Sequence, residues 1–320
     1  MIERGLREPV RAPDLTGRVY VVTGANAGLG FFASEQLVRA GADVVMTGRN
    51  PVRLAAAREA LLTRREASGD DRGGRCETLL LDTSNLGSVR AAAATLRQRG
   101  RIDGVLLNAG MLHPPRSRRT TLDGNELVFA TNVLGHFALA GALLTTLAAA
   151  RGRLVWIGSV STSLFASDPV DLQLQSRYSP WRAYVQSKVA TTAIGLEADR
   201  RLREGRVPVQ SIVAHPGYAT SGRTPAIRGV NEPTRRGQFL DALQAPVSQS
   251  KELGARPLVR ALTDPAASGG ELWGPRFVLH GTPRRARPAG LTRDRAVQER
   301  LWAGCESAAQ LRWPFEAARR

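Results

Sequence analysis

The chain has 320 residues, 42% hydrophobic and 5% aromatic, a composition that predicts one globular domain with a substantial core. Its 45 basic residues outnumber its 28 acidic residues, which gives a formal net charge of +17. The excess is arginine spread along the chain, without the alternation of basic and aromatic residues that stacks nucleobases, so we expect no nucleic-acid partner.

The apolar segments predict neither a signal peptide nor a membrane span. Residues 1–7 contain no apolar stretch. The longest uncharged run, residues 127–150, includes Asn132 and His136 and therefore predicts a buried helix. Two distant cysteines and four histidines without shared spacing predict no disulfide and no metal site. We therefore expect a reduced, cytoplasmic protein.

Strands and helices are expected to alternate through the first two thirds of the chain. Apolar, β-branched runs predict strands at residues 18–23, 42–47, 76–81, 103–107, 152–157 and 207–214. Helical patterns occupy the intervening residues 31–41, 51–67, 88–97, 124–150 and 181–203. This alternation predicts an α/β protein: a single-domain Rossmann fold, with a doubly wound parallel sheet covered by helices on both faces.

The last third of the chain has a weaker pattern. It predicts a helix at residues 251–262, a last strand at 277–279, an Arg- and Pro-rich stretch at 282–288 and a final helix at 294–311. We expect one domain over residues 1–320, with a core at 14–217, a substrate flap at 218–250 and a C-terminal extension at 282–320.

A glycine-rich turn, Gly24–Gly30, follows the first strand and opens the first helix. Glycines allow a tight turn and close backbone approach, and the helix N-terminus faces a pyrophosphate, so this turn predicts a dinucleotide site. The second strand ends in Thr47-Gly48-Arg49 without a carboxylate. Arg49 is suited to pair with a 2′-phosphate, which favours NADP(H) over NAD(H).

Tyr184 and Lys188 lie one helical turn apart, and Lys188 is one of only two lysines in the chain. A nearby ammonium is expected to lower the pKa of the phenol. A phenol tuned in this way can transfer a proton at a carbonyl or alcohol group.

Three motifs in the right order resemble the short-chain dehydrogenase/reductase family over nearly the whole chain. They are Thr23-Gly-Ala-Asn-Ala-Gly-Leu-Gly30, Asn108-Ala-Gly110 and Tyr184-Val-Gln-Ser-Lys188. The segment Asp123-Gly-Asn-Glu-Leu-Val-Phe-Ala-Thr-Asn132-Val-Leu-Gly-His-Phe137 is similar to the retinol-dehydrogenase-like and protochlorophyllide-reductase-like branch.

The resemblance implies four catalytic residues. Tyr184 would exchange the proton, and Lys188 would lower its pKa and hold the nicotinamide ribose. Ser159 would hydrogen-bond the substrate oxygen, with Ser161 and Ser163 as less favoured alternatives. Asn132 would hold a water that links Lys188 to solvent, or would simply be a satisfied helix residue.

The resemblance also implies the cofactor-binding residues Gly24, Asn26, Ala27, Gly28, Leu29, Gly30, Arg49, Asp82, Thr83, Asn108, Ala109, Gly110, Tyr184, Lys188, Pro216, Gly217 and Thr220. Asp82 with Thr83 would lie near the adenine or cap the following helix. Asn108 would stabilise the sheet more than it touches a ligand. The chain departs from the family pattern at Gly158, where serine is usual, and at Gln186.

The sequence therefore predicts an NADPH-dependent oxidoreductase that reduces a carbonyl group of a small, fairly apolar molecule, or runs the reverse reaction. Leu164, Phe165, Trp181, Tyr218 and Phe239 are expected to shape the pocket. The alternative is a catalytically silent dinucleotide-binding sensor or scaffold. The sequence leaves open whether the chain is a monomer, a homodimer or a homotetramer.

Overall fold

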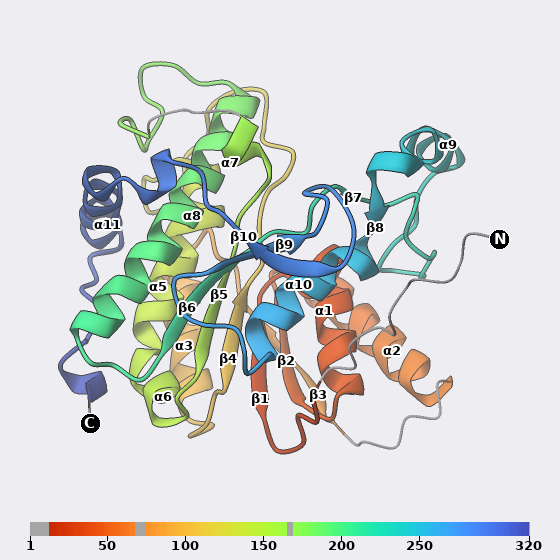
Figure 1. Cartoon of the computed structure of the whole chain (residues 1–320), viewed down its shortest axis with the longest axis horizontal. Coiled ribbons are helices and arrows are strands. Elements are labelled where there is room, and N and C mark those ends of the chain that lie inside the picture. The colour runs from red at the N-terminus through yellow and green to blue at the C-terminus, as the bar shows by residue number, and fades with distance from the viewer. Residues whose placement is uncertain (1–12, 68–73, 165–168, 320) are drawn as a thin grey trace.

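The computed structural model describes residues 13–67, 74–164 and 169–319, and within them an eight-stranded sheet forms the centre of the molecule (Figure 1). Its order is β10-β9-β6-β5-β4-β1-β2-β3. The strands are β1 (Val19–Val22), β2 (Asp43–Gly48), β3 (Cys76–Leu80), β4 (Gly104–Leu107), β5 (Arg153–Ile157), β6 (Gln210–Ala214), β9 (Leu272–Pro275) and β10 (Pro283–Ala286). All pairs are parallel except β9 with β10. The predicted doubly wound sheet is confirmed, with one antiparallel strand added at its edge.

Helices cover both faces of this sheet (Figure 1). One layer contains α1 (Gly28–Arg39), α2 (Pro51–Ala67) and α10 (Lys251–Thr263), and the other contains α3 (Leu86–Arg97), α5 (Gly135–Ala142), α8 (Pro180–Glu204) and α11 (Arg295–Ala309). Side chains alternate between the two cores, since Val21 joins one cluster while Tyr20 and Val22 join the other. Strands buried on both faces read as the unbroken apolar runs seen in the sequence.

The predicted single helix at residues 124–150 is wrong in its bounds and continuity. It is divided into α4 (Leu127–Phe129), a π-helical turn (Ala130–Leu134), α5 and α6 (Leu144–Ala149). The start is set by Glu126, whose carboxylate accepts hydrogen bonds from the N–H groups of Val128 and Phe129. Such π turns disturb the regular hydrogen-bond ladder and often lie at functional sites.

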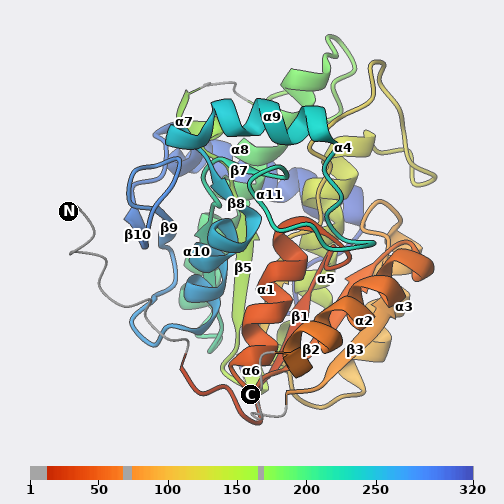
Figure 2. The same cartoon turned by 90° about the vertical axis from the view of Figure 1, so that its right-hand side faces the viewer.

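The segment 218–250 contains ordered elements. Strand β7 (Ala219–Thr220) pairs in parallel with β8 (Gln249–Ser250), and between them come α9 (Arg235–Leu243) and a short 3₁₀ turn (Ala245–Val247). Helix α9 buries none of its side chains and lies beyond the carboxyl ends of the strands, on the side of α1 and α10 (Figures 1 and 2).

The predicted strand at residues 277–279 is wrong. Phe277 is 61% exposed, and Val278 has a φ of +66°, because the chain turns there between β9 and β10. The Arg- and Pro-rich stretch that follows forms β10 itself. Pro283 lies on the outermost strand, where proline does not interrupt the sheet.

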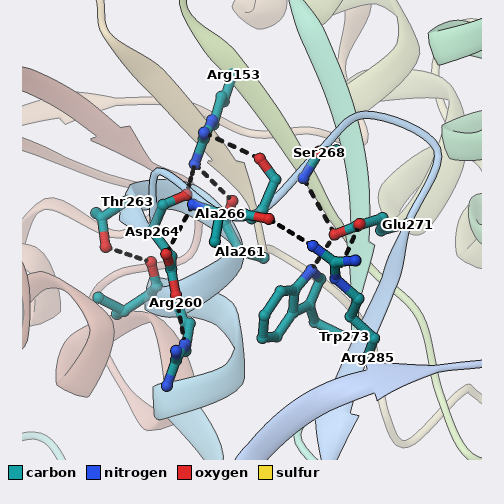
Figure 3. A network of polar contacts seen from close by, with 12 residues as sticks. Arg153, Arg260, Ala261, Thr263, Asp264, Ala266, Ser268, Glu271, Trp273 and Arg285 are labelled. Atoms are coloured by element: carbon teal, nitrogen blue, oxygen red, sulfur yellow. Dashed lines mark hydrogen bonds and ion pairs between the residues drawn. The ribbon is translucent and has the colours of Figure 1, made fainter. Parts of the chain in front are cut away.

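Arginine side chains connect β5 and β10 to the residues around α10 and β9 (Figure 3). Arg153 of β5 donates hydrogen bonds to the carbonyls of Asp264 (2.7 Å) and Ala267 (3.1 Å) just beyond α10. Glu271 forms an ion pair with Arg285 of β10 at 2.9 Å and accepts a hydrogen bond from the indole of Trp273 at 2.8 Å. These contacts join β5 and β10 to β9 and to the residues that follow α10.

The C-terminal residues pack on the second helical layer. Trp302 of α11 is fully buried against Phe137 of α5, with ring centroids 4.9 Å apart, and against Trp313 at the same separation. The guanidinium of Arg201 lies 4.7 Å from the Trp302 ring, a cation–π contact. Helix α11 is therefore part of the core on this face.

Candidate active site

The predicted site residues gather at the carboxyl edge of the sheet, where β1 and β4 lie side by side. The strand order reverses between these two, which makes this edge the switch point where ligands bind in open α/β sheets. The turn after β1 is Gly24–Gly30, and the turn after β4 begins with Asn108-Ala109-Gly110.

The glycine turn is packed too closely for other residues. A Cβ on Gly24, whose φ is +65°, would lie 2.8 Å from the Cα of Ala109. A Cβ on Gly30 would lie 2.5 Å from the Asn108 side-chain nitrogen. The first turn of α1 has no side-chain cap at Ala27 and no acidic residue, so its N–H groups are suited to bind an anion.

The hydroxyl of Thr23 joins the two turns. It accepts hydrogen bonds from the backbone N–H groups of Asn108 and Ala109, both at 2.8 Å. The Asn108 amide in turn donates to the Thr23 carbonyl at 2.8 Å. Asn108 therefore holds β1 and β4 in register, in line with its predicted structural role.

His136 connects this hydroxyl to the π turn. Its Nε2 lies 2.9 Å from Thr23 Oγ1, and its Nδ1 lies 3.2 Å from the Asn132 carbonyl oxygen. The carbonyl can only accept, so Nδ1 carries the proton and Nε2 accepts from Thr23. Complete burial lowers the pKa of His136 to about 3, so the ring is neutral.

The Asn132 side chain continues the chain of polar contacts toward α8. Its Oδ1 accepts from the N–H of Met111 at 2.7 Å, and its Nδ2 donates to Ser187 Oγ at 2.9 Å. Ser187 donates in turn to the carbonyl of Tyr184 at 2.7 Å. A continuous network thus runs from the glycine turn to the tyrosine, through a residue predicted as catalytic.

Tyr184 and Ser159 lie together. The phenol donates to Ser159 Oγ at 3.4 Å, while Ser161 Oγ lies 2.9 Å from the same atom. Of these two serines, Ser159 is the one with a hydrogen bond to the phenol, and Ser161 orients it. Burial raises the pKa of Tyr184, and the hydrogen bond to Ser159 opposes this shift.

Lys188 is buried one turn beyond Tyr184, with 8% of its surface exposed. Its ammonium donates to the Ile157 carbonyl at 2.8 Å. Burial lowers the pKa of Lys188 to about 8. The expected lowering of the Tyr184 pKa is wrong. Burial removes water from around the phenol and raises its pKa more than the hydrogen bond to Ser159 lowers it.

The residues predicted near the adenosine lie at the ends of β2 and β3. Arg49 is exposed directly after β2. Asn26 lies beside the last residue of that strand, since a Cβ on Gly48 would be 3.1 Å from the Asn26 Oδ1. Asp82 accepts from the N–H and hydroxyl of Ser84. The alternative that Asp82 or Thr83 caps α3 is wrong, because Asn85 is the N-cap residue.

The residues predicted near the nicotinamide follow β6. Gly217 has a φ of +67°, and a Cβ there would lie 2.2 Å from the Leu279 carbonyl oxygen. The Pro216 carbonyl accepts from the Gln249 amide at 2.7 Å. Thr220 Oγ1 is buried and has no hydrogen-bond partner among the described residues. A buried hydroxyl left in this way, together with the uncapped α1, fits a bound dinucleotide.

The structure accounts for both departures from the family pattern. A Cβ on Gly158 would lie 2.9 Å from Thr192 Oγ1 and 3.2 Å from Val213 Cγ1, so a serine does not fit here. Gln186 is buried and donates to the Asp171 carbonyl at 2.8 Å, which anchors the segment that precedes α8.

Sequence reasoning missed Thr23, His136 and Ser187 as members of the network. The spacing of Asn132 and His136, four residues apart in an apolar helix, was the available signal, since two polar groups on one buried helical face require partners. Phe165 lies outside the described residues.

Together, the fold and this site define a dinucleotide-binding α/β oxidoreductase. The profile of the family described as short chain dehydrogenase matches residues 18–229. Polyprenol dehydrogenase of Mus musculus is 36% identical over 306 residues, which cover 94% of this chain and 86% of that protein. Retinol dehydrogenase 13 of Homo sapiens is 32% identical over 294 residues, 90% of this chain and 83% of that protein.

A solved structure of an uncharacterized protein from Mycobacterium paratuberculosis is also similar, with a TM-score of 0.75, 30% identity and coverage of 95% of this chain and 97% of that one. The chain belongs to the short-chain dehydrogenase/reductase family. It is an NAD(P)-dependent oxidoreductase that acts on alcohol and carbonyl groups. Within the described part of the chain, no helix has the length and apolarity needed to cross a bilayer.

Proposed function

We propose that the protein is an NADPH-dependent reductase of a carbonyl group on a fairly apolar molecule, or the corresponding alcohol dehydrogenase. The observation that carries this is the hydrogen bond between Tyr184 and Ser159 one turn from the buried Lys188. Two hydroxyls that converge in this way can both donate to one substrate oxygen.

The residues divide the chemistry among them. When bound, the nicotinamide supplies the hydride for reduction. Tyr184 gives its proton to the substrate oxygen, and its raised pKa keeps the phenol protonated at neutral pH. Ser159 donates a hydrogen bond to the same oxygen as negative charge develops there. Lys188 places a cation next to the site, held at the Ile157 carbonyl.

An apolar substrate is favoured by the side chains beyond the phenol. Trp181 is 54% exposed, and its ring centroid lies 6.2 Å from that of Tyr184. Tyr218 and Phe239 of the flap are also exposed. The similar polyprenol and retinol dehydrogenases are named for isoprenoid alcohols, so we propose an alcohol or aldehyde with a long apolar chain.

Cofactor preference is proposed from Arg49, which lies exposed at the end of β2 with no acidic residue at that position. Charge-assisted hydrogen bonds to a 2′-phosphate should contribute about 10- to 100-fold in affinity. One of the solved structures with a similar fold is the Pseudomonas aeruginosa RhlG/NADP active-site complex, whose protein is 23% identical to this chain.

The test measures nucleotide binding and turnover separately. NADPH and NADH are titrated by nicotinamide fluorescence on the wild type and on Arg49→Ala, which should weaken NADPH alone. A panel of aldehydes of graded isoprenoid length is then assayed on the wild type and on Tyr184→Phe. Turnover that is lost in Tyr184→Phe with NADPH binding intact supports the reductase. Tight binding without turnover of any carbonyl or alcohol would favour the sensor, and no binding of either nucleotide would overturn both.

A further inference from the structure

Lys251, the second of the two lysines, begins α10 beside the glycine turn. A Cβ placed on Gly28 would lie 3.9 Å from the Lys251 Cδ, and nothing else comes within 4 Å of it. The approach is fixed by packing around it: a Cβ on Gly254 would lie 3.1 Å from Leu29 and 2.9 Å from Ala219. The Gln36 side chain also donates to the Glu252 carbonyl at 2.9 Å.

The ammonium of Lys251 is held by uncharged groups. It donates to Ser221 Oγ at 2.6 Å and to Asn231 Oδ1 at 3.3 Å. Among the ion pairs of the described residues, none includes Lys251. Burial lowers the pKa of Lys251, and the Asp241 carboxylate opposes this shift. A half-buried cation without an ion pair is a costly arrangement unless an anion joins it.

The surroundings of Gly28 make an anion the natural partner. The N-terminus of a helix carries a partial positive charge, and that of α1 has neither a side-chain cap nor an acidic residue. The Lys251 side chain passes Gly28 and so brings a second positive charge toward this end, which is unfavourable without a counter-ion. An anion between the two would be attracted by both.

We propose that Lys251 is a phosphate-binding residue of the cofactor site, where its ammonium contacts the pyrophosphate that the glycine turn and the N-terminus of α1 hold. This inference rests on the proposed dinucleotide site and adds to it a cation from the first residue of α10, directly after the flap.

The same contact links cofactor binding to the flap. Ser221 and Asn231 both belong to the segment 218–250, and the Asn231 amide donates to the carbonyls of Ser221, Thr224 and Pro225 at 3.1, 3.2 and 3.1 Å. The Lys251 N–H also donates to Thr224 Oγ1 at 2.9 Å. Lys251 thus connects the phosphate-binding turn to the loop that leads into α9.

The experiment compares Lys251→Met, Lys251→Arg and the control Ser221→Ala, which removes a partner of the ammonium and keeps the charge. Each is titrated with NADPH, NADH, ADP-ribose and adenosine 2′-phosphate, the last of which lacks the pyrophosphate. Lys251→Met should weaken the first three by about 10- to 100-fold, equally for NADPH and NADH, and leave adenosine 2′-phosphate unchanged. Lys251→Arg should recover part of the loss, and Ser221→Ala should change affinity by less than about threefold, because it keeps the positive charge that attracts the pyrophosphate.

Salt dependence separates a phosphate contact from a purely structural one. Removing a phosphate-contacting charge should make the affinity of Lys251→Met for ADP-ribose less sensitive to ionic strength than that of the wild type. Unchanged affinity in Lys251→Met, or equal weakening of adenosine 2′-phosphate with an unchanged salt dependence, would overturn the inference. A wild type that binds none of the pyrophosphate compounds would instead refute the dinucleotide site itself.

Discussion

Gly158 offers a direct test of the packing beside Ser159. The contact distances of 2.9 Å to Thr192 Oγ1 and 3.2 Å to Val213 Cγ1 leave no room for a Cβ. Overpacking of this kind costs about 1–3 kcal/mol, so we expect Gly158→Ser to lower the free energy of unfolding by about 2 kcal/mol. Thr192→Ala removes the nearer atom, a buried hydroxyl without a described partner, and should cost little by itself.

Combining the two substitutions tests whether Thr192 is the source of the clash. If the clash is with Thr192, Gly158→Ser in the Thr192→Ala background should cost at least about 1 kcal/mol less than in the wild type, measured by urea unfolding in a double-mutant cycle. Gly290→Ser is the matched control: its Cβ meets nothing within 4 Å, and its φ is −53°. Additive effects within about 0.5 kcal/mol, or an equal loss at Gly290, would refute the reasoning.

Three further predictions concern stability, each measured by urea unfolding. Lowering the pH from 7 to 5 should reduce the free energy of unfolding by about 4 kcal/mol. Burial lowers the pKa of His136 to about 3 and that of His215 to about 4, from 6.5, so the unfolded chain binds more protons than the folded protein in this range. An unchanged free energy of unfolding would contradict the burial of these two rings. Thr23→Val should lower the free energy of unfolding by about 1–3 kcal/mol, since two partly buried N–H groups lose their acceptor, whereas a loss below about 0.5 kcal/mol would mean that these groups find other partners. Trp302→Ala should cost about 3–5 kcal/mol, and a smaller loss would show that α11 is dispensable to the core.

The sequence predicted the alternating core well because its signals are local. Strands buried on both faces read as apolar runs, and α2 has the predicted bounds, Pro51–Ala67, because proline begins it and the apolar spacing continues. The predicted catalytic residues could be placed at one edge, since the carboxyl ends of parallel strands share that edge.

The edge of the sheet could not be predicted from local pattern. β10 has exposed side chains, and only its pairing with β9 makes it a strand. Residues 277–279 are apolar, yet Phe277 and Val278 are exposed in a turn. The π turn around Asn132 could not be predicted from the sequence either. An uncharged helical run has the same residue pattern whether its backbone hydrogen bonds are regular or shifted by one residue.

The number of hydrogen-bond acceptors around each buried cation explains why two positions of this arginine-rich chain carry lysine. Arg153 is partly buried and donates to the Gln210 side chain and to three carbonyls, which satisfies its planar fork of donors. Lys188 has one such acceptor, Ile157, and Lys251 has Ser221 and Asn231. A guanidinium has five N–H donors and would leave several unsatisfied at either place, whereas a compact ammonium keeps its remaining protons for a ligand. Both lysines lie where donors remain to be used, one beside the proposed proton-transfer pair and one beside the phosphate-binding turn.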